Sequence, residues 1–352
     1  MDHRSGIRLL IVTQTVDIAD PVLGFFHGWL REFSKRYEKI SVVCLKQGEH
    51  HLPVNVQVYS LGKEQQASKL NYVLNFYRHV WKLRREYDTV LVHMNQEYVL
   101  LGGLLWKLLG KKVFLWRNHY SGSLLTDIAA ALCTKVFCTS RFSYTAKYKK
   151  TILMPVGIDT GTWKPIERVE RKGSILSLGR IAPSKRLEIL IEAVGILKQK
   201  GITIQTNIYG DALPVDASYR DSIIRNVQEK KLERVVHFHP GIPNIGTPGV
   251  YSAHELFVNC SHSGMYDKTI FEAAACEALA VASSRDYADI TDPRLVFDGT
   301  PQDLAGRIEV LFALPPQEKD ALRQKARASV EDNSLSKLAQ VLAYELAQQR
   351  LN

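Results

Sequence analysis

Short apolar runs alternate with amphipathic stretches along almost the whole chain. In the first half, the runs have the length of strands, and the segments between most of them repeat their apolar residues at helical spacing. We expect strands at residues 7–13, 40–45, 54–61, 89–93, 112–116, 135–139 and 151–154. Alternation of this kind is typical of βαβ units, so the pattern predicts a mostly parallel sheet with helices on its faces.

The pattern lapses once and then resumes. Residues 155–172 hold Gly157, Gly161, Pro165 and many charges, which indicates a linker. Strands are expected again at residues 174–178, 203–209, 235–238, 256–259 and 279–283. We therefore predict an α/β protein of two Rossmann-like, doubly wound domains, residues 1–160 and 161–333, facing a central cleft. Residues 334–352 are expected to form a C-terminal helix, with Ser334 as a possible cap, that packs back on the first domain.

Composition supports two ordinary domains and excludes several classes of protein. At 352 residues the chain is longer than domains with a single hydrophobic core usually are. Its content of hydrophobic residues, 45%, is typical of globular proteins. We find no secretory signal, and the longest apolar stretch, residues 98–106, is too short to span a membrane. The five cysteines form no Cys-x-x-Cys pair, which favours buried free thiols. The expected location is the cytoplasm, with a peripheral position at the inner face of the membrane as a further possibility.

The excess of positive over negative charge lies entirely in the first half of the chain. Residues 1–165 carry 23 Lys and Arg against 12 Asp and Glu, whereas the remainder carries 23 against 24. This asymmetry suggests that the first domain meets an anionic partner, such as a membrane surface, an acidic glycan or nucleic acid. Residues 69–87 read as a basic amphipathic helix, which can rest on anionic lipid or simply bury its apolar face in the core.

One strand, loop and helix has the features of an anion site. Residues 174–178 form the expected strand, and Arg180 and Lys185 follow in the loop before a helical pattern that ends at Gly201. Ser184 is the expected N-cap, so the helix N-terminus would face the loop. Two cationic side chains beside a helix N-terminus favour the binding of a phosphate or diphosphate group. The alternative is that both are solvated loop charges.

A second signal lies in residues 261–283. A buried strand ends in small residues, and a polar turn leads into a helix in which Glu272 has mostly apolar neighbours. Its carboxylate is then expected near the carboxyl edge of the sheet, although an exposed helix glutamate is the alternative. No Walker loop, Gly-x-Gly-x-x-Gly or His-Glu-x-x-His pattern occurs, and no metal site is expected.

Four motifs together resemble one family. They are Ser177 to Arg180 with Lys185, Met154 to Asp159, Tyr209-Gly210-Asp211, and Phe271 to Cys276. As a set they resemble family 4 retaining glycosyltransferases, or glycosyl transferases group 1, of the GT-B fold. The resemblance implies that Arg180 and Lys185 hold the donor's diphosphate and that Glu272 binds the ribose. It further places Gly210, Pro240 and Gly241 on the donor side, with the base near the last two.

In the first half, residues 115–119 resemble the strand end that carries the family's donor-facing histidine, here His119. The family usually has a glutamate where this chain has Gly264. The resemblance therefore leaves the sugar contact to Asp267, which could instead be a helix N-cap, or to backbone around Gly264, Met265 and Tyr266. The loop after the first strand also departs from the family, and the acceptor-side candidates are Asp17, Asp20, Gly24 and Asn118.

The function expected from this resemblance is metal-independent transfer of a sugar, of hexosyltransferase type, with retention of configuration. The donor would be a nucleoside-diphosphate sugar, and the acceptor a glycan or lipid-linked molecule in polysaccharide or glycolipid biosynthesis. No cofactor is expected, and an anionic membrane surface is a possible partner of the basic first domain. The alternatives are a nucleotide-sugar epimerase and a non-catalytic basic membrane- or nucleic-acid-binding protein. We expect no nucleic acid, because no aromatic and basic groove motif is recognisable.

Overall fold

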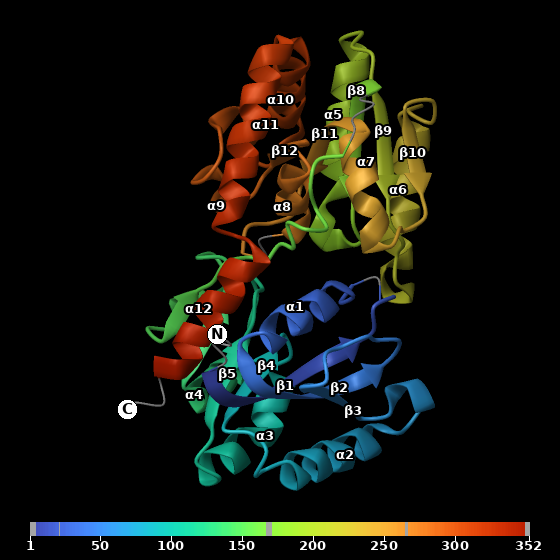
Figure 1. Ribbon diagram of the computed structural model, residues 1–352. Helices are drawn as coiled ribbons and strands as arrows, with labels where there is room; N and C mark the ends of the chain where they lie inside the picture. Colours follow the sequence, from blue (N-terminus) through green and yellow to red (C-terminus); the bar gives the residue numbers. More distant parts are fainter. Residues whose placement is uncertain (1–4, 21, 167–170, 265–266, 349–352) are drawn as a thin grey trace. The chain divides into compact units, whose positions relative to one another are not determined.

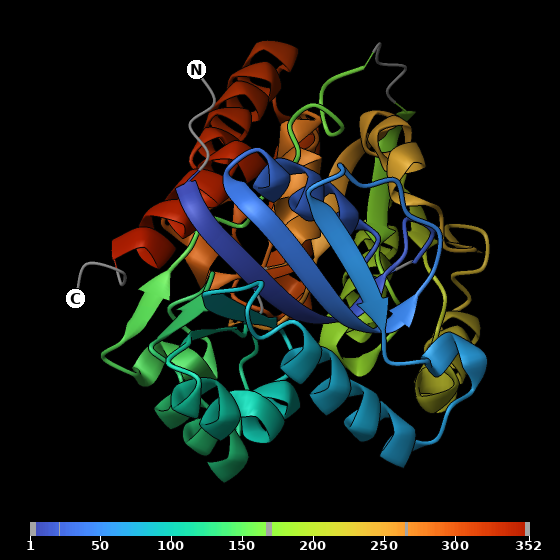
Figure 2. The same ribbon diagram turned by 60° about the horizontal axis from the view of Figure 1, so that its bottom comes forward.

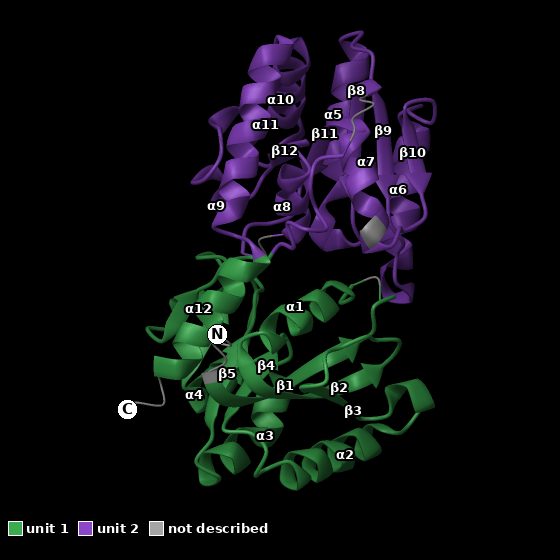
Figure 3. Cartoon of the chain, in the orientation of Figure 1, with its two compact units in different colours: residues 1–157, 335–352 green, residues 158–334 purple. Residues whose placement is uncertain are grey.

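The chain divides into two compact units, which the computed structural model describes over residues 5–20, 22–166, 171–264 and 267–348 (Figure 1). Unit 1 comprises residues 1–157 and 335–352, and unit 2 comprises residues 158–334 (Figure 3). The sequence placed these boundaries after residues 160 and 333. The chain passes from one unit to the other twice, after residue 157 and after residue 334. The two segments of unit 2 next to these crossings are hydrogen-bonded, because Ile158 N donates to Asn333 O at 2.9 Å.

Unit 1 is built on a parallel sheet of seven strands in the order β3-β2-β1-β4-β5-β6-β7. Its long first strands lie at the centre of Figure 2, in blue. The strands are β1 (Ser5–Val16), β2 (Tyr37–Gln47), β3 (Val56–Ser60), β4 (Thr89–His93), β5 (Lys112–Trp116), β6 (Lys135–Cys138) and β7 (Thr151–Leu153). The helices are α1 (Phe25–Ser34), α2 (Lys69–Lys82), α3 (Glu97–Leu108), α4 (Leu124–Leu132) and α12 (Leu335–Gln348).

Both faces of this sheet are covered, because successive side chains of a strand point to opposite sides. On β1, Leu9 and Ile11 pack in one cluster with residues of α1 and α12. Leu10 and Val12 pack in the other, with residues of α2, α3 and α4. Helix α12 contributes five buried side chains to the first cluster, so it is an integral part of the core of unit 1.

Unit 2 has a parallel sheet of five strands in the order β10-β9-β8-β11-β12. These are β8 (Arg171–Leu178), β9 (Gln205–Tyr209), β10 (Val236–His239), β11 (His254–Asn259) and β12 (Leu279–Ala282). The helices are α5 (Leu187–Gln199), α6 (Ala217–Glu229), α7 (Thr247–Ser252), α8 (Lys268–Ala275), α9 (Arg285–Ala288), α10 (Pro301–Ala313) and α11 (Pro316–Glu331). The interior strand β11, which lies between β8 and β12, is buried along its whole length, as expected for a parallel sheet covered on both faces.

Two parallel-sheet α/β units of this kind are the predicted fold class. No helix of the described residues is both long and apolar enough to cross a membrane. Within those residues all five cysteines are buried free thiols, as predicted.

Candidate functional site

The strand order of unit 2 reverses direction between β8 and β11. From β8 the chain crosses to β9 on one side, and from β11 it crosses to β12 on the other. The loops that follow β8 and β11 therefore diverge and leave a hollow at the carboxyl edge, lined by Gly179, Arg180, Lys185, Asn259 and Ser261 among others. Ligands of doubly wound sheets bind at such switch points. Both signals found in the sequence lead into this edge.

The loop after β8 is held against the end of β9 by a close backbone approach. Gly210 has a φ of +152°, and a Cβ built there would lie 1.9 Å from the carbonyl oxygen of Gly179. The amide of Ile181 also donates to the carbonyl of Asp211 at 3.0 Å. A side chain at Gly210 cannot be accommodated without moving the loop that carries Arg180.

The loop after β10 is tied to the same edge. Gly241 N donates to Asp211 Oδ2 at 3.1 Å, and Gly210 N donates to the carbonyl of His239 at 3.1 Å. Pro240, exposed, precedes Gly241 in this loop. Hydrogen bonds therefore connect each of the three loops after β8, β9 and β10 to its neighbour. The residues predicted to contact the base and those predicted to contact the phosphates lie on the same edge of the sheet.

The predicted start of helix α5 is wrong. Residues Pro183–Lys185 form a 3-10 turn, and Arg186 then adopts the left-handed conformation, with a φ of +51°. The helix begins at Leu187 rather than after Ser184, and Leu187 N donates to the hydroxyl of Tyr219 at 2.8 Å. The guanidinium of Arg186 donates to the carbonyl of Gly299 at 3.1 Å. The turn, rather than the helix, sets the position of Lys185.

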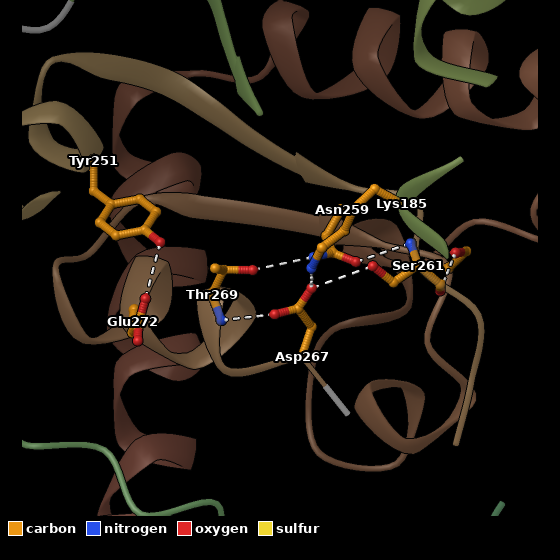
Figure 4. Close-up of polar contacts among 8 residues, drawn as sticks. Lys185, Tyr251, Asn259, Ser261, Asp267, Thr269 and Glu272 are labelled. Carbon is orange, nitrogen blue, oxygen red and sulfur yellow. Dashed lines mark hydrogen bonds and ion pairs between the residues drawn. The ribbon is translucent and has the colours of Figure 1, made fainter. Parts of the chain in front are cut away.

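Lys185 and Asp267 form an ion pair across the switch point (Figure 4). The same Asp267 oxygen, Oδ2, accepts from Asn259 Nδ2 at 2.9 Å and from Ser261 Oγ at 3.2 Å. The other oxygen accepts from the amide of Thr269 at 3.3 Å, so Asp267 is the N-cap of α8. These donors, and above all Lys185, outweigh burial and lower the pKa of Asp267 to about 2.

Arg180 lies on the open side of the same loop. Its side chain is 42% exposed, and its Nε is 3.8 Å from Asp216 Oδ2. An ion pair at that distance and exposure contributes little energy, so the guanidinium can reorient toward an anion at small cost. Of the two predicted phosphate ligands, Arg180 is loosely held and Lys185 is firmly held.

Glu272 lies one turn further along α8 and faces away from the Lys185 cluster. The carboxylate is buried, and its Oε2 accepts from the hydroxyl of Tyr251 at 3.2 Å. Burial raises the pKa of Glu272, and the nearby Lys268 ammonium partly offsets that rise. The same burial lowers the pKa of Lys268. The alternative of an exposed helix glutamate is therefore wrong for Glu272.

His119 follows β5 in unit 1, and its Nδ1 contacts the backbone amide, the carbonyl oxygen (3.3 Å) and the hydroxyl of Ser121. The amide of Ser121 donates to its Nδ1 at 3.0 Å, and the Ser121 hydroxyl lies 2.8 Å from the same nitrogen. A neutral ring that accepts at Nδ1 carries its proton on Nε2. Burial lowers the pKa of His119, aided by Arg117, so the ring is neutral at pH 7 and can donate from Nε2.

The acceptor-side candidates are all engaged in local structure of unit 1. Asp17 lies 3.4 Å from Lys46, and Asp20 Oδ1 accepts from the amides of residues 22 and 23. Gly24 approaches the carbonyl of Asp20 too closely for a Cβ, which would lie 2.6 Å away. Asn118 Oδ1 accepts from Ser143 Oγ at 2.8 Å. These bonds shape the loops but do not by themselves indicate an acceptor.

The remaining predicted positions can be reported briefly. Gly264 is buried with a φ of +95°, whereas Met265 and Tyr266 lie outside the described residues. Among the described residues, no group of three or more His, Cys, Asp or Glu could hold a metal ion. Sequence reasoning missed Asn259, Ser261, Tyr251 and Lys268. Only Lys268 gave a usable signal, because it lies four residues before Glu272 on a helix.

Comparison with known proteins follows this geometry. Residues 160–329 match the family model described as glycosyl transferases group 1. That segment lies within unit 2 and contains all the unit 2 residues of the candidate site. A comparison with curated proteins gives no significant match.

Solved structures match nearly the whole chain at low identity. Anabaena HepE in complex with UDP and glucose is 19% identical, with 97% of this chain and 99% of that chain covered and a TM-score of 0.78. Sucrose-phosphate synthase from Thermosynechococcus elongatus is 16% identical, with 98% and 100% covered and a TM-score of 0.80. The lipopolysaccharide outer core galactosyltransferase WaaB is 13% identical, with 96% and 99% covered and a TM-score of 0.65. The chain thus has the GT-B fold, as expected.

Proposed function

We propose that this protein is a retaining, metal-independent glycosyltransferase that uses a nucleoside-diphosphate sugar as donor. The observation that carries the proposal is that Arg180 and Lys185 line the hollow at the switch point of unit 2, while the buried Glu272 lies on α8, which begins at the same edge of the sheet. These residues lie in the segment that matches glycosyl transferases group 1. UDP is the first nucleotide to test, because HepE is described in complex with UDP and glucose.

Each donor group has a candidate partner. Arg180 and Lys185 would bind the diphosphate, whose negative charge grows as the sugar leaves. Glu272 would accept hydrogen bonds from the ribose hydroxyls, and the Tyr251 hydroxyl already donates to one of its oxygens. Backbone near Pro240 and Gly241 would meet the base.

The proposed reaction exchanges one bond to the sugar's anomeric carbon for another. The bond from that carbon to the leaving phosphate oxygen breaks, and a bond to the acceptor hydroxyl oxygen forms on the same face. The leaving phosphate oxygen takes the acceptor proton, so no protein base is required. The Nε2 proton of neutral His119 would donate to a hydroxyl of the transferred sugar. Arg180 and Lys185 supply the electrostatic stabilisation, each about 2–4 kcal/mol.

The first experiment is calorimetric titration of UDP, then GDP, into the protein without divalent metal. Lys185→Ala and Glu272→Ala should each weaken binding of the same nucleotide at least about tenfold. Lys200→Ala is the matched control, because Lys200 forms an ion pair with Glu309 outside this site. The proposal fails if no nucleotide binds, or if both site variants bind like the wild type.

Measurement of enzymatic turnover then distinguishes sugar transfer from epimerisation. With the nucleotide that binds, its sugar derivatives should release free nucleoside diphosphate faster when an acceptor is added. An epimerase would change the sugar without any acceptor. Proton NMR of the product should give the anomeric configuration of the donor, and inversion would contradict the retaining mechanism.

We also propose that unit 1 rests on an anionic membrane that carries a lipid-linked acceptor. Four apolar residues of α2 lie on one stripe, and all are exposed, at 68%, 57%, 39% and 53%: Leu70, Leu74, Tyr77 and Trp81. The buried residues of α2 are instead Phe76 and Val80. Of the two interpretations of this helix, burial of the apolar face in the core does not hold for these four residues, and their exposure supports membrane contact, which we propose.

Neighbouring features extend this stripe. The hydroxyl of Tyr77 donates to the carbonyl of Leu101 on α3 at 2.9 Å, and Leu104 and Leu108 of α3 are also exposed. Arg78, Lys82 and Arg85 are exposed beside it. Apolar and basic side chains together are the combination that binds anionic lipid surfaces.

Vesicle co-sedimentation tests this second proposal. The protein should sediment with phosphatidylglycerol vesicles, less so with phosphatidylcholine vesicles, and less as salt rises. The pair Leu74→Ser and Trp81→Ser should reduce binding, whereas Val54→Ser, at a 99% exposed valine of the same unit, should not. Equal binding to phosphatidylglycerol and phosphatidylcholine vesicles would contradict the proposal. So would a double variant that binds vesicles as well as the wild type does.

A further inference from the structure

The anion-binding groups at the switch point of unit 2 are already occupied by a carboxylate of the chain. Four donors converge on Asp267: the Lys185 ammonium, the Asn259 amide, the Ser261 hydroxyl and the Thr269 backbone amide. Three of these meet on the single oxygen Oδ2 (Figure 4). Ammonium, amide, hydroxyl and helix N-terminal N–H groups are the donors that bind phosphate in proteins.

The pair between Lys185 and Asp267 is well shielded from water. The two side chains are only 20% and 14% exposed. A charge in such a shielded place needs an opposite charge beside it. An incoming anion can therefore bind tightly to the Lys185 ammonium only if it takes the place of the Asp267 carboxylate. The contrast with Arg180 is direct, because that side chain is 42% exposed and only loosely paired.

We propose that Asp267 is an internal competitor for the diphosphate and sets the affinity of the donor site. The inference rests on the proposed function, because it takes Lys185 as a ligand of the donor's diphosphate. In this structure Asp267 neutralises Lys185. When a nucleoside diphosphate binds, Lys185 turns at least partly from the carboxylate to the phosphate oxygens, and Asp267 stays close as a like charge. Both effects weaken binding of donor and of product.

This role differs from the sugar contact that the sequence suggested for Asp267. Its Oδ2 is saturated by three donors, and its Oδ1 caps α8 through Thr269. A carboxylate so engaged has little remaining capacity to accept from sugar hydroxyls. A moderate affinity for the diphosphate product has a use, because release of product limits the turnover of many enzymes.

The test is calorimetric titration of the nucleotide that binds the wild type. Asp267→Asn keeps the size of the side chain and one acceptor oxygen but removes the negative charge, and it should bind that nucleotide roughly tenfold more tightly. Asp267→Ser retains helix capping and serves as a second variant if the asparagine variant does not fold. In the Lys185→Ala background the same substitution should tighten binding by less, because the competition for Lys185 is gone.

The outcomes separate this inference from the proposed function. If the nucleotide binds and Lys185→Ala weakens it, but Asp267→Asn binds equally or more weakly, the function stands and the competitor role is overturned. If the gain from Asp267→Asn is undiminished in the Lys185→Ala background, Asp267 acts without Lys185 and the inference is also overturned. If no nucleotide binds any variant, the proposed function fails, and the inference fails with it.

Discussion

The two sheets have equivalent switch points with opposite chemistry. In unit 1 the order reverses between β1 and β4, where Thr13 and His93 are buried and share a hydrogen bond of 3.1 Å. The His93 ring stacks on Phe26, with ring centroids 4.2 Å apart. In unit 2 the corresponding edge carries Lys185 and Asp267. One topology therefore encloses an aromatic cluster in the first unit and a charged cluster in the second, and the loops rather than the fold decide which.

The largest effect is expected at the glycine that fits the loops of unit 2 together. Gly210→Ala places a Cβ against the carbonyl of Gly179, in a backbone region that side chains rarely adopt. We expect a loss of about 3 kcal/mol or more in the free energy of unfolding, or displacement of the loop and loss of nucleotide binding. Gly195→Ala, in α5 with no neighbour closer than 4.0 Å, should be neutral or stabilising. Urea unfolding would measure both, and an unchanged Gly210→Ala protein would show that the close approach is not required.

The ion pair of Lys185 and Asp267 should make the free energy of unfolding depend on pH in the acid range. The pKa of Asp267 is lowered to about 2 from an ordinary value near 3.8. A carboxyl with a lowered folded-state pKa stabilises the protein above its unfolded-state pKa, and this contribution disappears as pH falls through the folded-state value. The stability difference between wild type and Asp267→Asn should shrink by about 2 kcal/mol between pH 5 and pH 2. A difference that stays constant with pH would indicate that the carboxylate is not held by Lys185.

The smallest effect is expected at the aromatic cluster of unit 1. His93→Phe retains a ring of similar size but removes the hydrogen bond to Thr13, and it should cost about 1 kcal/mol of unfolding free energy. Nucleotide affinity should not change, because the donor residues lie in unit 2. A weaker nucleotide complex without a comparable loss of stability would indicate that the first switch point also serves the donor, and the contrast between the two edges would fail.

Strands were easier to predict than the details of the site. Strands β4 and β5 have the predicted ends, because buried parallel strands form compact apolar runs bounded by polar residues. The start of α5 was wrong, since Arg186 adopts a left-handed conformation, and its guanidinium donates to the carbonyl of Gly299, which lies 113 residues away. The pair of Lys185 and Asp267 joins loops 82 residues apart. Local patterns cannot reveal such partners, although both residues were named individually as candidates.

The exposed stripe of α2 shows a different limit. The sequence gives an apolar face including Leu70, Leu74 and Trp81, and an apolar helix face is ordinarily buried. The structure instead buries Phe76 and Val80, so the helix carries two apolar faces and only one meets the sheet. Which of the two faces inward depends on α3 and β2, and helical periodicity alone could not decide it.

The position of α12 determines the order in which the protein can be completed during synthesis. Leu338, Leu342 and Leu346 fill part of the core of unit 1, yet the ribosome makes them after all of unit 2. Unit 2 is a continuous segment and can fold as soon as it emerges. Unit 1 begins first but must wait with an exposed apolar surface until its last helix arrives. A chain truncated after residue 334 and released from the ribosome should therefore contain a folded second unit and an unfinished first one.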